Sequence, residues 1–570
     1  MLWIILLLLT IGRLFLACTG CLNGTEAYLL LCGQHLNWGF VEGPAGVPAL
    51  IRMSTWLAGS SPMGIRLSSP FLLLLASFML WQLAIHLYGK RVAFWSVLAF
   101  NVLPLTNTAG LIMDGTIVVT TLWIVTLSWS WLLITHHKTG LLSWVVYGLL
   151  LGITTQVSYS VGWLLLVVLV IIYARQQKCD WLGVAVTFLL LMLSWVGPIG
   201  WNMDHDWLQW GQITWGSFWS YDLPPWKVLQ LSPWFWQFLL LLLLSIPSIA
   251  PMLFSCKGEE FKKNLSFLVL LLVPFLFCVG GIGHDSPSFG LQLVLWAMLL
   301  PSIVDFFLKT EWRAKSGTRL FHTDSAAACE HLMDTVSASN CSSGSMKHTA
   351  VVAIHHLPCL HQDSWRLATN QYEICGLVLL SIAAIFSALQ ILEIAPVINN
   401  ASLWSIPSYQ GVRGLPKIAA EILRLRALEK ETLHDLNVPS STIFIIAETP
   451  ELASLLGAFL PIHYSELEGA PSVFTPESPS FSSQFQLWPH YADAVASGVV
   501  DPLYTEETKT SPFLGHDAFY VTTESLEDLP ETISGAFSSV LLVSEATLQR
   551  GNQSEHLHIY ECKNYQMLPL

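Results

Sequence analysis

Long apolar runs separated by short polar segments fill the first 308 residues, and one more such run lies near residue 380. A helix needs about 20 apolar residues to cross a bilayer, and about eleven runs approach that length. They lie near residues 2–18, 69–88, 92–111, 116–135, 140–156, 158–174, 181–200, 234–254, 264–280, 288–308 and 374–394. Because a helix satisfies its own backbone hydrogen bonds in lipid, the pattern predicts a polytopic α-helical membrane protein.

The polar segment after the first run, residues 22–68, is too polar to span a bilayer and too rich in Trp, Leu and Ile for a flexible linker. It carries Glu26, Glu42, Arg52 and Arg66, whereas the spans that follow hold few charges. Acids and arginines just outside an apolar bundle suggest a functional site at the membrane–water boundary. The simpler alternative is an interfacial loop whose charges are solvated.

The short loops between the spans alternate in charge. Cations occupy every second loop, at Lys90-Arg91, His136-His137-Lys138, Arg175 with Lys178, Lys257 with Lys262-Lys263, and Lys309 with Arg313 and Lys315. The loops near Asp114, Gln156, Asp204 and Asp285 carry few or none. Since cytoplasmic loops carry the excess of Lys and Arg, we predict a cytoplasmic N-terminus. The loop at 22–68 and everything after about residue 395 are then extracytoplasmic.

Residues 309–371 form a polar cytoplasmic insertion that contains several Cys and His side chains. They are Cys329, His331, Cys341, His355, His356, Cys359 and His361. Such a cluster could hold zinc, but its spacings match no standard pattern and Ser/Ala-rich sequence separates its members. A disordered loop is the favoured interpretation.

The tail alternates between strand and helix patterns, which indicates a small extracytoplasmic α/β domain. Helical patterns cover 414–436 and 450–460, and strand patterns cover 441–447, 518–521 and 539–543. No Gly-rich phosphate loop or nucleophile elbow occurs in it. The predicted domains are a transmembrane domain at 1–308 with its first external loop at 19–68, the insertion at 309–371, a last transmembrane helix at 372–395 and the α/β domain at 396–570.

Composition agrees with a membrane protein. Of 570 residues, 53% are hydrophobic and 11% are charged, against about 25% charged in soluble domains. The net charge of −13 reflects acids concentrated toward the C-terminus, which argues against nucleic acid as a partner. Cys18 and Cys21 lack the strand–helix setting of a redox motif. No basic region precedes the first run, so it is read as a retained helix and not a signal peptide.

Several short segments occur in a recognisable order along this topology. They are Thr25-Glu26-Ala27-Tyr28, Gly39-Phe40-Val41-Glu42-Gly43-Pro44, Gly64-Ile65-Arg66-Leu67-Ser68, Met113-Asp114-Gly115 and Trp201-Asn202-Met203-Asp204-His205-Asp206-Trp207, followed in the tail by 444–447, 451–454 and 483–488. In order and topology they resemble the family 39 membrane glycosyltransferases of the C-type superfamily. That family includes protein O-mannosyltransferase-like bacterial enzymes and the aminoarabinose transferases that act on lipid A. The resemblance covers nearly the whole chain apart from the insertion at 309–371.

The resemblance implies the C-type glycosyltransferase fold and a multi-pass protein of the bacterial inner, or plasma, membrane. A family enzyme moves a sugar from a polyprenyl-phosphate donor to a lipid, glycan or protein acceptor at the outer face, in contact with membrane lipid. The transfer needs a base for the acceptor hydroxyl and positive charge for the departing phosphate. The candidate base is Glu26, with Asp114 as a second candidate catalytic acid, and the candidate phosphate-binding cations are Arg52 and Arg66. A divalent cation at Glu42, with His205 or His284 as the histidine, is a further expectation; interfacial histidines without a ligand are the alternative.

The sequence also departs from the family pattern. Thr25 stands where the family carries its presumed catalytic Asp, Gly43 where His or Lys is frequent, and Ser158 where many members carry Lys. These losses motivate a second hypothesis, a catalytically degenerate member that acts as a lipid-binding or scaffold protein. A transporter ranks last, because it predicts internal repeats with acids at mid-membrane, and here the acids lie at span ends.

Overall fold

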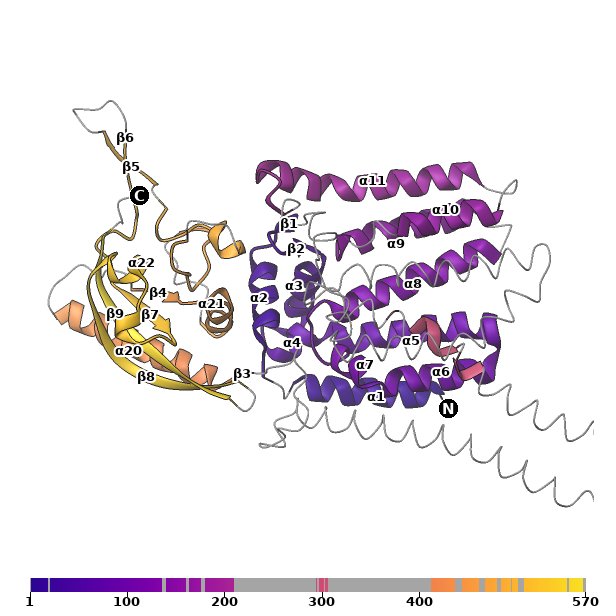
Figure 1. Cartoon of the computed structure of the whole chain (residues 1–570), viewed down its shortest axis with the longest axis horizontal. Helices are drawn as coiled ribbons and strands as arrows, with labels where there is room; N and C mark the ends of the chain where they lie inside the picture. The colour runs from indigo at the N-terminus through magenta and orange to yellow at the C-terminus, as the bar shows by residue number, and fades with distance from the viewer. Residues whose placement is uncertain are drawn as a thin grey trace, which may run out of the picture.

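A helical bundle and a sheet domain lie end to end in the computed structural model (Figure 1). The structure describes residues 2–18, 21–135, 140–159, 164–175, 180–209, 294, 297–301, 303–305, 412–435, 443–460, 467–478, 483–493, 495–500, 507–550 and 553–566. The predicted spans at 234–254, 264–280 and 374–394, most of that at 288–308, and the insertion at 309–371 lie outside these residues.

The helices of the bundle follow the predicted spans closely. They are α1 (Leu2–Ala17), α5 (Ser68–Tyr88), α6 (Lys90–Val102), α7 (Pro104–Ala109), α8 (Thr116–Thr135), α9 (Leu141–Thr155), α10 (Leu164–Arg175) and α11 (Trp181–Asp204). Within the described residues, three helices are long and apolar enough to cross a membrane, Pro62–Tyr88, Thr116–Thr135 and Trp181–Asp204. Two shorter apolar helices, Leu2–Ala17 and Leu141–Thr155, accompany them. This part of the chain is therefore a polytopic helical membrane protein.

The predicted third span, 92–111, is wrong as a single helix. It divides into α6 and α7 at Leu103, whose backbone is extended (φ −61°, ψ 132°). Proline has no N–H to continue the helix, and it disfavours the helical conformation in the residue before it. Pro104 therefore ends α6 and begins the short helix α7. This break leads the chain from the bundle into the segment that carries Asp114.

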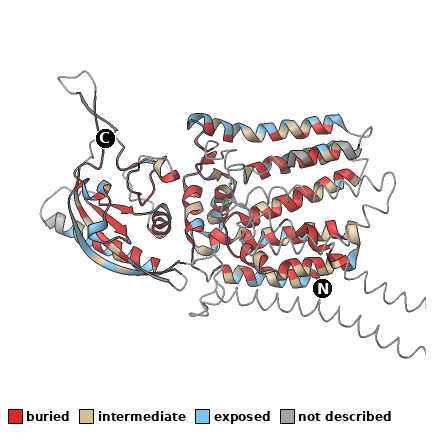
Figure 2. Ribbon diagram, in the orientation of Figure 1, coloured by how far each residue is buried: buried red, intermediate tan, exposed pale blue. Residues whose placement is uncertain are grey.

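Residues that face the interior of the bundle are buried, and residues on its outer surface are exposed (Figure 2). Trp123 and Trp144 are wholly buried in its core. On the outer face of α11, Leu189 and Leu193 are each 67% exposed. Soluble proteins rarely expose large apolar patches to water. The apolar outer face of α11 is therefore suited to contact with lipid.

A buried arginine lies in the interior of the bundle, near the C-terminal end of α1. Arg13 on α1 is 3% exposed. Its guanidinium donates to the side-chain oxygens of Asn101 at 3.0 Å and Asn107 at 2.6 and 3.2 Å, and to the carbonyl of Asn101 at 3.1 Å. The amide of Asn101 donates in turn to the hydroxyl of Ser77 at 2.8 Å. The network ties α1 to α5, α6 and α7.

We expect Arg13→Lys to lower the thermal stability of the detergent-solubilised protein. Lysine is a point donor and lacks the planar fork that reaches both amides, so at least one charge-assisted hydrogen bond worth about 1.5–3 kcal/mol is lost. Lys90→Gln at the exposed start of α6 is the control and should leave the melting temperature unchanged. Equal melting temperatures for Arg13→Lys and the wild type would contradict a stabilising role.

The first loop folds into a compact cap on one end of the bundle, between the bundle and the sheet domain (Figure 1). Its elements are α2 (Gly24–Gln34), β1 (Gly39–Phe40), β2 (Gly43–Pro44), α3 (Gly46–Ala58) and α4 (Pro62–Arg66). β1 and β2 pair as a tight antiparallel hairpin with Glu42 in its turn. The N-terminus of the chain lies at the opposite end of the bundle.

The C-terminal domain, residues 412–566, contains a five-stranded mixed sheet in the order β3-β8-β9-β7-β4. Its elements are β3 (Val412–Arg413), α20 (Leu415–Asp435), β4 (Phe444–Ala447), α21 (Pro450–Gly457), β5 (Val495–Val500), β6 (Glu507–Thr510), β7 (Ala518–Thr522), α22 (Glu531–Ser534), β8 (Phe537–Arg550) and β9 (Gln553–Tyr565). β4 and β7 are parallel, and β7, β9 and β8 are antiparallel neighbours. The two predicted helices and three predicted strands coincide with α20, α21, β4, β7 and part of β8.

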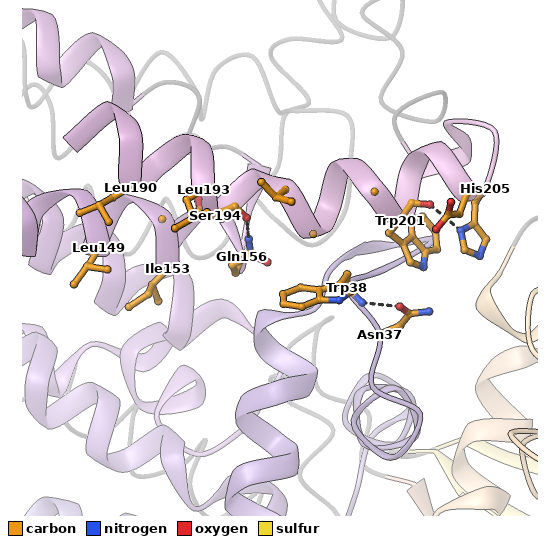
Figure 3. Close-up of a pocket in the computed structure, with 15 residues that line it drawn as sticks. Asn37, Trp38, Leu149, Ile153, Gln156, Leu190, Leu193, Ser194, Trp201 and His205 are labelled. Atoms are coloured by element: carbon orange, nitrogen blue, oxygen red, sulfur yellow. Dashed lines mark hydrogen bonds between the residues drawn. The ribbon is translucent and has the colours of Figure 1, made fainter. Parts of the chain in front are cut away.

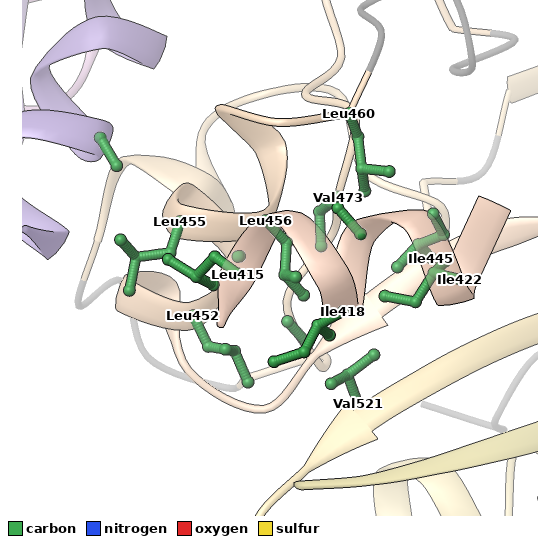
Figure 4. Close-up of a cluster of buried hydrophobic side chains, with 14 of the residues drawn as sticks. Leu415, Ile418, Ile422, Ile445, Leu452, Leu455, Leu456, Leu460, Val473 and Val521 are labelled. Carbon is green, nitrogen blue, oxygen red and sulfur yellow. The ribbon is translucent and has the colours of Figure 1, made fainter. Parts of the chain in front are cut away.

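Apolar side chains from α20, α21 and the sheet form one core (Figure 4). Ile422, Leu455 and Val521 are wholly buried there. Ala27 and Leu31 of α2 belong to the same cluster, so the first loop and the C-terminal domain share buried surface. The two segments predicted to lie outside the membrane thus pack together at one end of the bundle.

Candidate functional site

The charged residues of the first loop meet at the end of the bundle that faces the C-terminal domain. Glu26 lies in the first turn of α2, where Asn23 caps the helix by accepting from the Glu26 N–H at 2.7 Å. Arg66 ends α4 just before the second span. Both side chains are 0% exposed, and they form a two-pronged ion pair with Nε–Oε1 and Nη2–Oε2 distances of 2.6 Å each.

The carboxylate of Glu26 has its accepting positions occupied. Oε1 also accepts from the backbone N–H of Met113 at 3.0 Å, and Oε2 from that of Asn23 at 3.3 Å. Arg66 donates further to the carbonyl of Cys21 at 2.7 Å. The pair therefore ties α2, α4 and the segment before α8 together. In this arrangement Glu26 holds Arg66 and the Met113 backbone, so its assignment as the catalytic base stays a prediction that the geometry does not favour.

Asp114 follows Met113 directly and is only half-buried. Its Oδ1 accepts from the backbone N–H of Thr116 at 2.9 Å, at the start of α8. Burial, followed by the nearby charge of Glu26, raises the pKa of Asp114 above its usual value. An acid with a raised pKa and a partly open carboxylate has the properties of a general base.

Glu42 occupies the turn of the β1–β2 hairpin and is partly exposed. One oxygen accepts from the hydroxyl of Tyr28 on α2, and the other from the backbone N–H of Gln484 in the C-terminal domain at 3.2 Å. Desolvation by the surrounding protein raises the pKa of Glu42, although these hydrogen bonds act in the opposite direction. Glu42 is thus a second acid of the site, and it lies where bundle and C-terminal domain meet.

The hairpin that carries Glu42 is held from the bundle side by a buried glutamine. The amide of Gln209, beyond the end of α11, donates to the carbonyl of Phe40 at 2.8 Å. Gln209 in turn accepts from the side chains of Asn202 at 2.9 Å and Tyr159 at 2.8 Å. The backbone of Gly46 donates to the carbonyl of Gln156 at 2.6 Å. The hairpin is therefore fixed to the ends of α9 and α11.

The two predicted phosphate-binding cations have different surroundings. Arg66 is buried in the ion pair with Glu26. Arg52 lies on α3 and its side chain is exposed. Of the two, Arg52 is therefore the one whose charge can reach a phosphate without rearrangement of the protein.

An apolar groove of about 710 Å³ runs between α9 and α11 beside the first loop (Figure 3). Ile153 and Leu193 line its length, and Trp38 and His205 lie toward the end near the first loop. His205 stacks on Trp201 with ring centroids 4.2 Å apart, and its Nδ1 lies 2.8 Å from the Trp201 carbonyl oxygen. His205 thus belongs to this groove.

The donor set for the expected divalent cation does not come together in this part of the chain. Across the described residues, no group of three or more His, Cys, Asp or Glu side chains could hold a metal ion. Glu42 is engaged by Tyr28 and Gln484, and His205 by Trp201. His284 lies outside the described residues. The metal site stays a prediction, and no step below depends on it.

The three positions where the sequence departs from the family pattern lie at or near the protein surface. Thr25 is exposed on α2, immediately beside the buried Glu26. Gly43 follows Glu42 in the hairpin, and Ser158 is half-buried just after α9. The surface positions near the site thus carry fewer charges than the family pattern has.

Known proteins resemble this chain in sequence and in structure. Residues 42–197 match the family model described as dolichyl-phosphate-mannose-protein mannosyltransferase. The structure aligns with ArnT from Cupriavidus metallidurans bound to undecaprenyl phosphate over 98% of this chain and 97% of that one, with a TM-score of 0.54 and 14% identity. The chain has the C-type glycosyltransferase fold. The apo state of the same ArnT aligns over the same shares with a TM-score of 0.52 and 12% identity. Among the curated proteins, none matches this chain.

The resemblance predicted from the short segments is thus confirmed. The family model covers residues 42–197, from the turn of the hairpin through most of α11, and the alignment with ArnT extends over both the bundle and the C-terminal domain. Tyr28, Gln209 and Gln484 were not predicted as site residues. Tyr28 and Gln484 stand in segments that carry the family resemblance, whereas Gln209 does not. Gln209 and Gln484 are neutral amides whose sequence carries no signal of their partners.

Proposed function

We propose that this protein is a membrane glycosyltransferase that moves a sugar from a polyprenyl-phosphate donor to an acceptor hydroxyl at the extracytoplasmic face. The observation that supports it most is the near-complete alignment with an ArnT that binds undecaprenyl phosphate. The clustered acids and arginines at one end of the bundle supply the groups that such a transfer needs. The identity of the sugar and the acceptor class, whether lipid, glycan or protein, are left to the experiment.

Asp114 is the base in this proposal. It accepts the proton of the acceptor hydroxyl while that oxygen attacks the anomeric carbon. The bond from the anomeric carbon to the phosphate oxygen breaks, and the polyprenyl phosphate leaves with the electron pair. Arg52 stabilises the negative charge of that phosphate. Glu26 and Arg66 act by fixing Met113, and hence Asp114, at the start of α8.

The groove between α9 and α11 fits the hydrocarbon part of the donor. Its walls are apolar along most of their length, and two of its polar residues, Asn37 and His205, lie toward the first loop (Figure 3). A prenyl chain in the groove buries apolar surface and leaves the phosphate and sugar beside the first loop. This orientation brings the scissile bond to the end of the bundle that carries Asp114.

The test is release of polyprenyl phosphate by the full-length protein in lipid. Mannose, glucose, galactose and aminoarabinose donors are supplied in turn, with and without a divalent cation. Release with one donor, lost in Asp114→Asn, supports the proposal. Absence of release with every donor, from protein that still binds the lipid, favours the second candidate function.

That second candidate is a non-catalytic lipid-binding or scaffold protein with the same fold. Thr25 and Ser158 favour it, because each lies at the surface or half-buried near the site and neither carries a charge. Here the groove and the buried ion pair persist for binding and stability, while transfer is lost. Binding of a polyprenyl phosphate without turnover of any donor distinguishes this function from the first.

We expect Arg52→Gln to raise the KM for the donor with little effect on protein stability. Loss of one charge-assisted hydrogen bond costs about 1.5–3 kcal/mol, which is about a 10- to 100-fold rise in KM. Lys417→Gln removes an exposed cation of α20 in the C-terminal domain and serves as the matched control. A donor KM equal to that of the wild type would remove Arg52 from the phosphate site.

A further inference from the structure

One residue of the C-terminal domain contacts both Val41 and Glu42, although it lies far from them in sequence. The side-chain Oε1 of Gln484 accepts from the backbone N–H of Val41 at 3.0 Å. The backbone N–H of Gln484 donates to Oε1 of Glu42 at 3.2 Å. Val41 is 2% and Gln484 is 4% exposed, so water does not compete strongly for the first of these contacts.

The segment around Gln484 is built to hold this position. Gln484 begins a short 3-10 helix, Gln484–Gln486, in which Ser483 and Gln486 satisfy each other's backbone N–H groups as a capping box. Phe485 packs against Tyr28 with ring centroids 6.4 Å apart, and Trp488 against His35 at 5.2 Å. The segment that follows Gln484 is therefore anchored against α2 and its C-terminal cap.

We propose that Gln484 is a positioning residue of the transfer site, which fixes the Glu42 carboxylate so that it accepts hydrogen bonds from hydroxyl groups of the transferred sugar. The C-terminal domain is then part of the site and not only an appendage. This inference rests on the proposed glycosyl transfer. It assigns Glu42 to the sugar, while Asp114 acts on the acceptor hydroxyl.

The backbone N–H of Gln484 holds Glu42 from the side of the C-terminal domain. It donates to Oε1, while the hydroxyl of Tyr28 on α2 donates to Oε2. Without that N–H, the described side-chain contacts of the carboxylate come from α2 alone.

Two substitutions at Gln484 separate its side chain from its N–H. Gln484→Ala removes the contact to Val41 and keeps the N–H that faces Glu42. Gln484→Pro removes both. Proline is well tolerated at the first position of a helix, and Ser483 before it is already extended (φ −149°, ψ 164°), as a residue before proline prefers. Gln549→Ala, at an exposed position on β8 of the same domain, is the control.

The experiment measures kcat, the KM for the donor and the amide exchange of residues 39–44 in the full-length protein. Gln484→Ala should lower kcat/KM by about 5- to 10-fold at neutral pH, the effect of one lost hydrogen bond, and speed exchange at Val41. Gln484→Pro also removes the contact to Glu42, so it should raise the donor KM above that of Gln484→Ala. Gln549→Ala should leave kcat, the donor KM and the exchange rates as in the wild type.

The outcomes distinguish a failure of the proposed glycosyl transfer from a failure of the positioning role of Gln484. A wild-type protein without turnover of any donor overturns the proposed function. A wild type that turns over, with the same donor KM for Gln484→Ala and Gln484→Pro, overturns the positioning role. Unchanged exchange at Val41 in Gln484→Ala likewise shows that the side chain does not hold the hairpin.

Discussion

Arg66→Ala is expected to lower the free energy of unfolding by about 3–5 kcal/mol, because it leaves the buried carboxylate of Glu26 without its partner. Both side chains are 0% exposed and share two contacts of 2.6 Å. Loss of the guanidinium also frees the carbonyl of Cys21, to which it donates. The measurement is thermal or denaturant unfolding of the purified protein in detergent. Arg52→Ala, an exposed arginine on α3, is the control and should unfold as the wild type does.

The double variant Glu26→Gln with Arg66→Met should be more stable than either single variant. It removes both charges together, and a buried ion pair can be replaced by uncharged side chains at little cost. Glutamine can still accept from the backbone N–H groups of Asn23 and Met113. A Glu26→Gln variant that loses transfer while it unfolds as the wild type does would contradict the structural role and restore Glu26 as the base. An Arg66→Ala variant as stable as the wild type would contradict it as well.

Six of the first seven spans were predictable because their signal is local. Runs such as 69–88 and 116–135 are apolar throughout, and the helices α5 and α8 begin and end within one residue of them. The one error, the span at 92–111, came from length being weighed above Pro104. The sheet domain was predicted in part. Strands β4 and β7 are apolar and buried, whereas β9 alternates polar and apolar residues and was missed.

The predicted strand at 539–543 shows how an apolar run misleads about burial. The residues do form part of β8, but Leu541 is 58% exposed and Leu542 47%. The buried side chains of this hairpin include Leu548 and Ile559, each at most 1% exposed. Register on a twisted sheet, and not hydrophobicity alone, decides which face is covered.

The charged residues of the candidate site could be picked out from the sequence by their type, but the contacts that each one makes could not. Glu26 stood out as an acid, yet its function depends on Arg66, which lies 40 residues away in sequence. The contact of Gln484 with Val41 spans 443 residues, and a neutral amide gives no sign of such a partner. Asp114 and Glu42 stay partly open because the cap of short helices α2–α4 folds around the ion pair. That cap is stabilised by contacts with the C-terminal domain, so its geometry could not be derived from local pattern.

Asp114→Asn is expected to lower kcat by about 10²- to 10⁴-fold, the contribution of a general base, without loss of stability. Asparagine keeps an oxygen that accepts from the Thr116 N–H. Because burial raises the pKa of Asp114 above its usual value, the folded state binds its proton more tightly than the unfolded state does. The stabilisation from that proton is present at acid pH and is lost as the pH rises through the folded pKa. At neutral pH the ionised carboxylate therefore opposes folding, and the asparagine variant should unfold at an equal or higher temperature.

The same raised pKa predicts that kcat/KM of the wild type falls on the acid side at a pH above the usual aspartate value. Asp180→Asn is the matched control. Asp180 also accepts from a backbone N–H at the start of a helix, that of Gly183 at 3.2 Å, but it lies at the far end of the bundle from Asp114. It should keep the wild-type rate and pH profile. An Asp114→Asn variant that retains full transfer would remove Asp114 as the base. Equal losses in Asp180→Asn and Asp114→Asn would mean that helix capping, and not proton transfer, accounts for the effect.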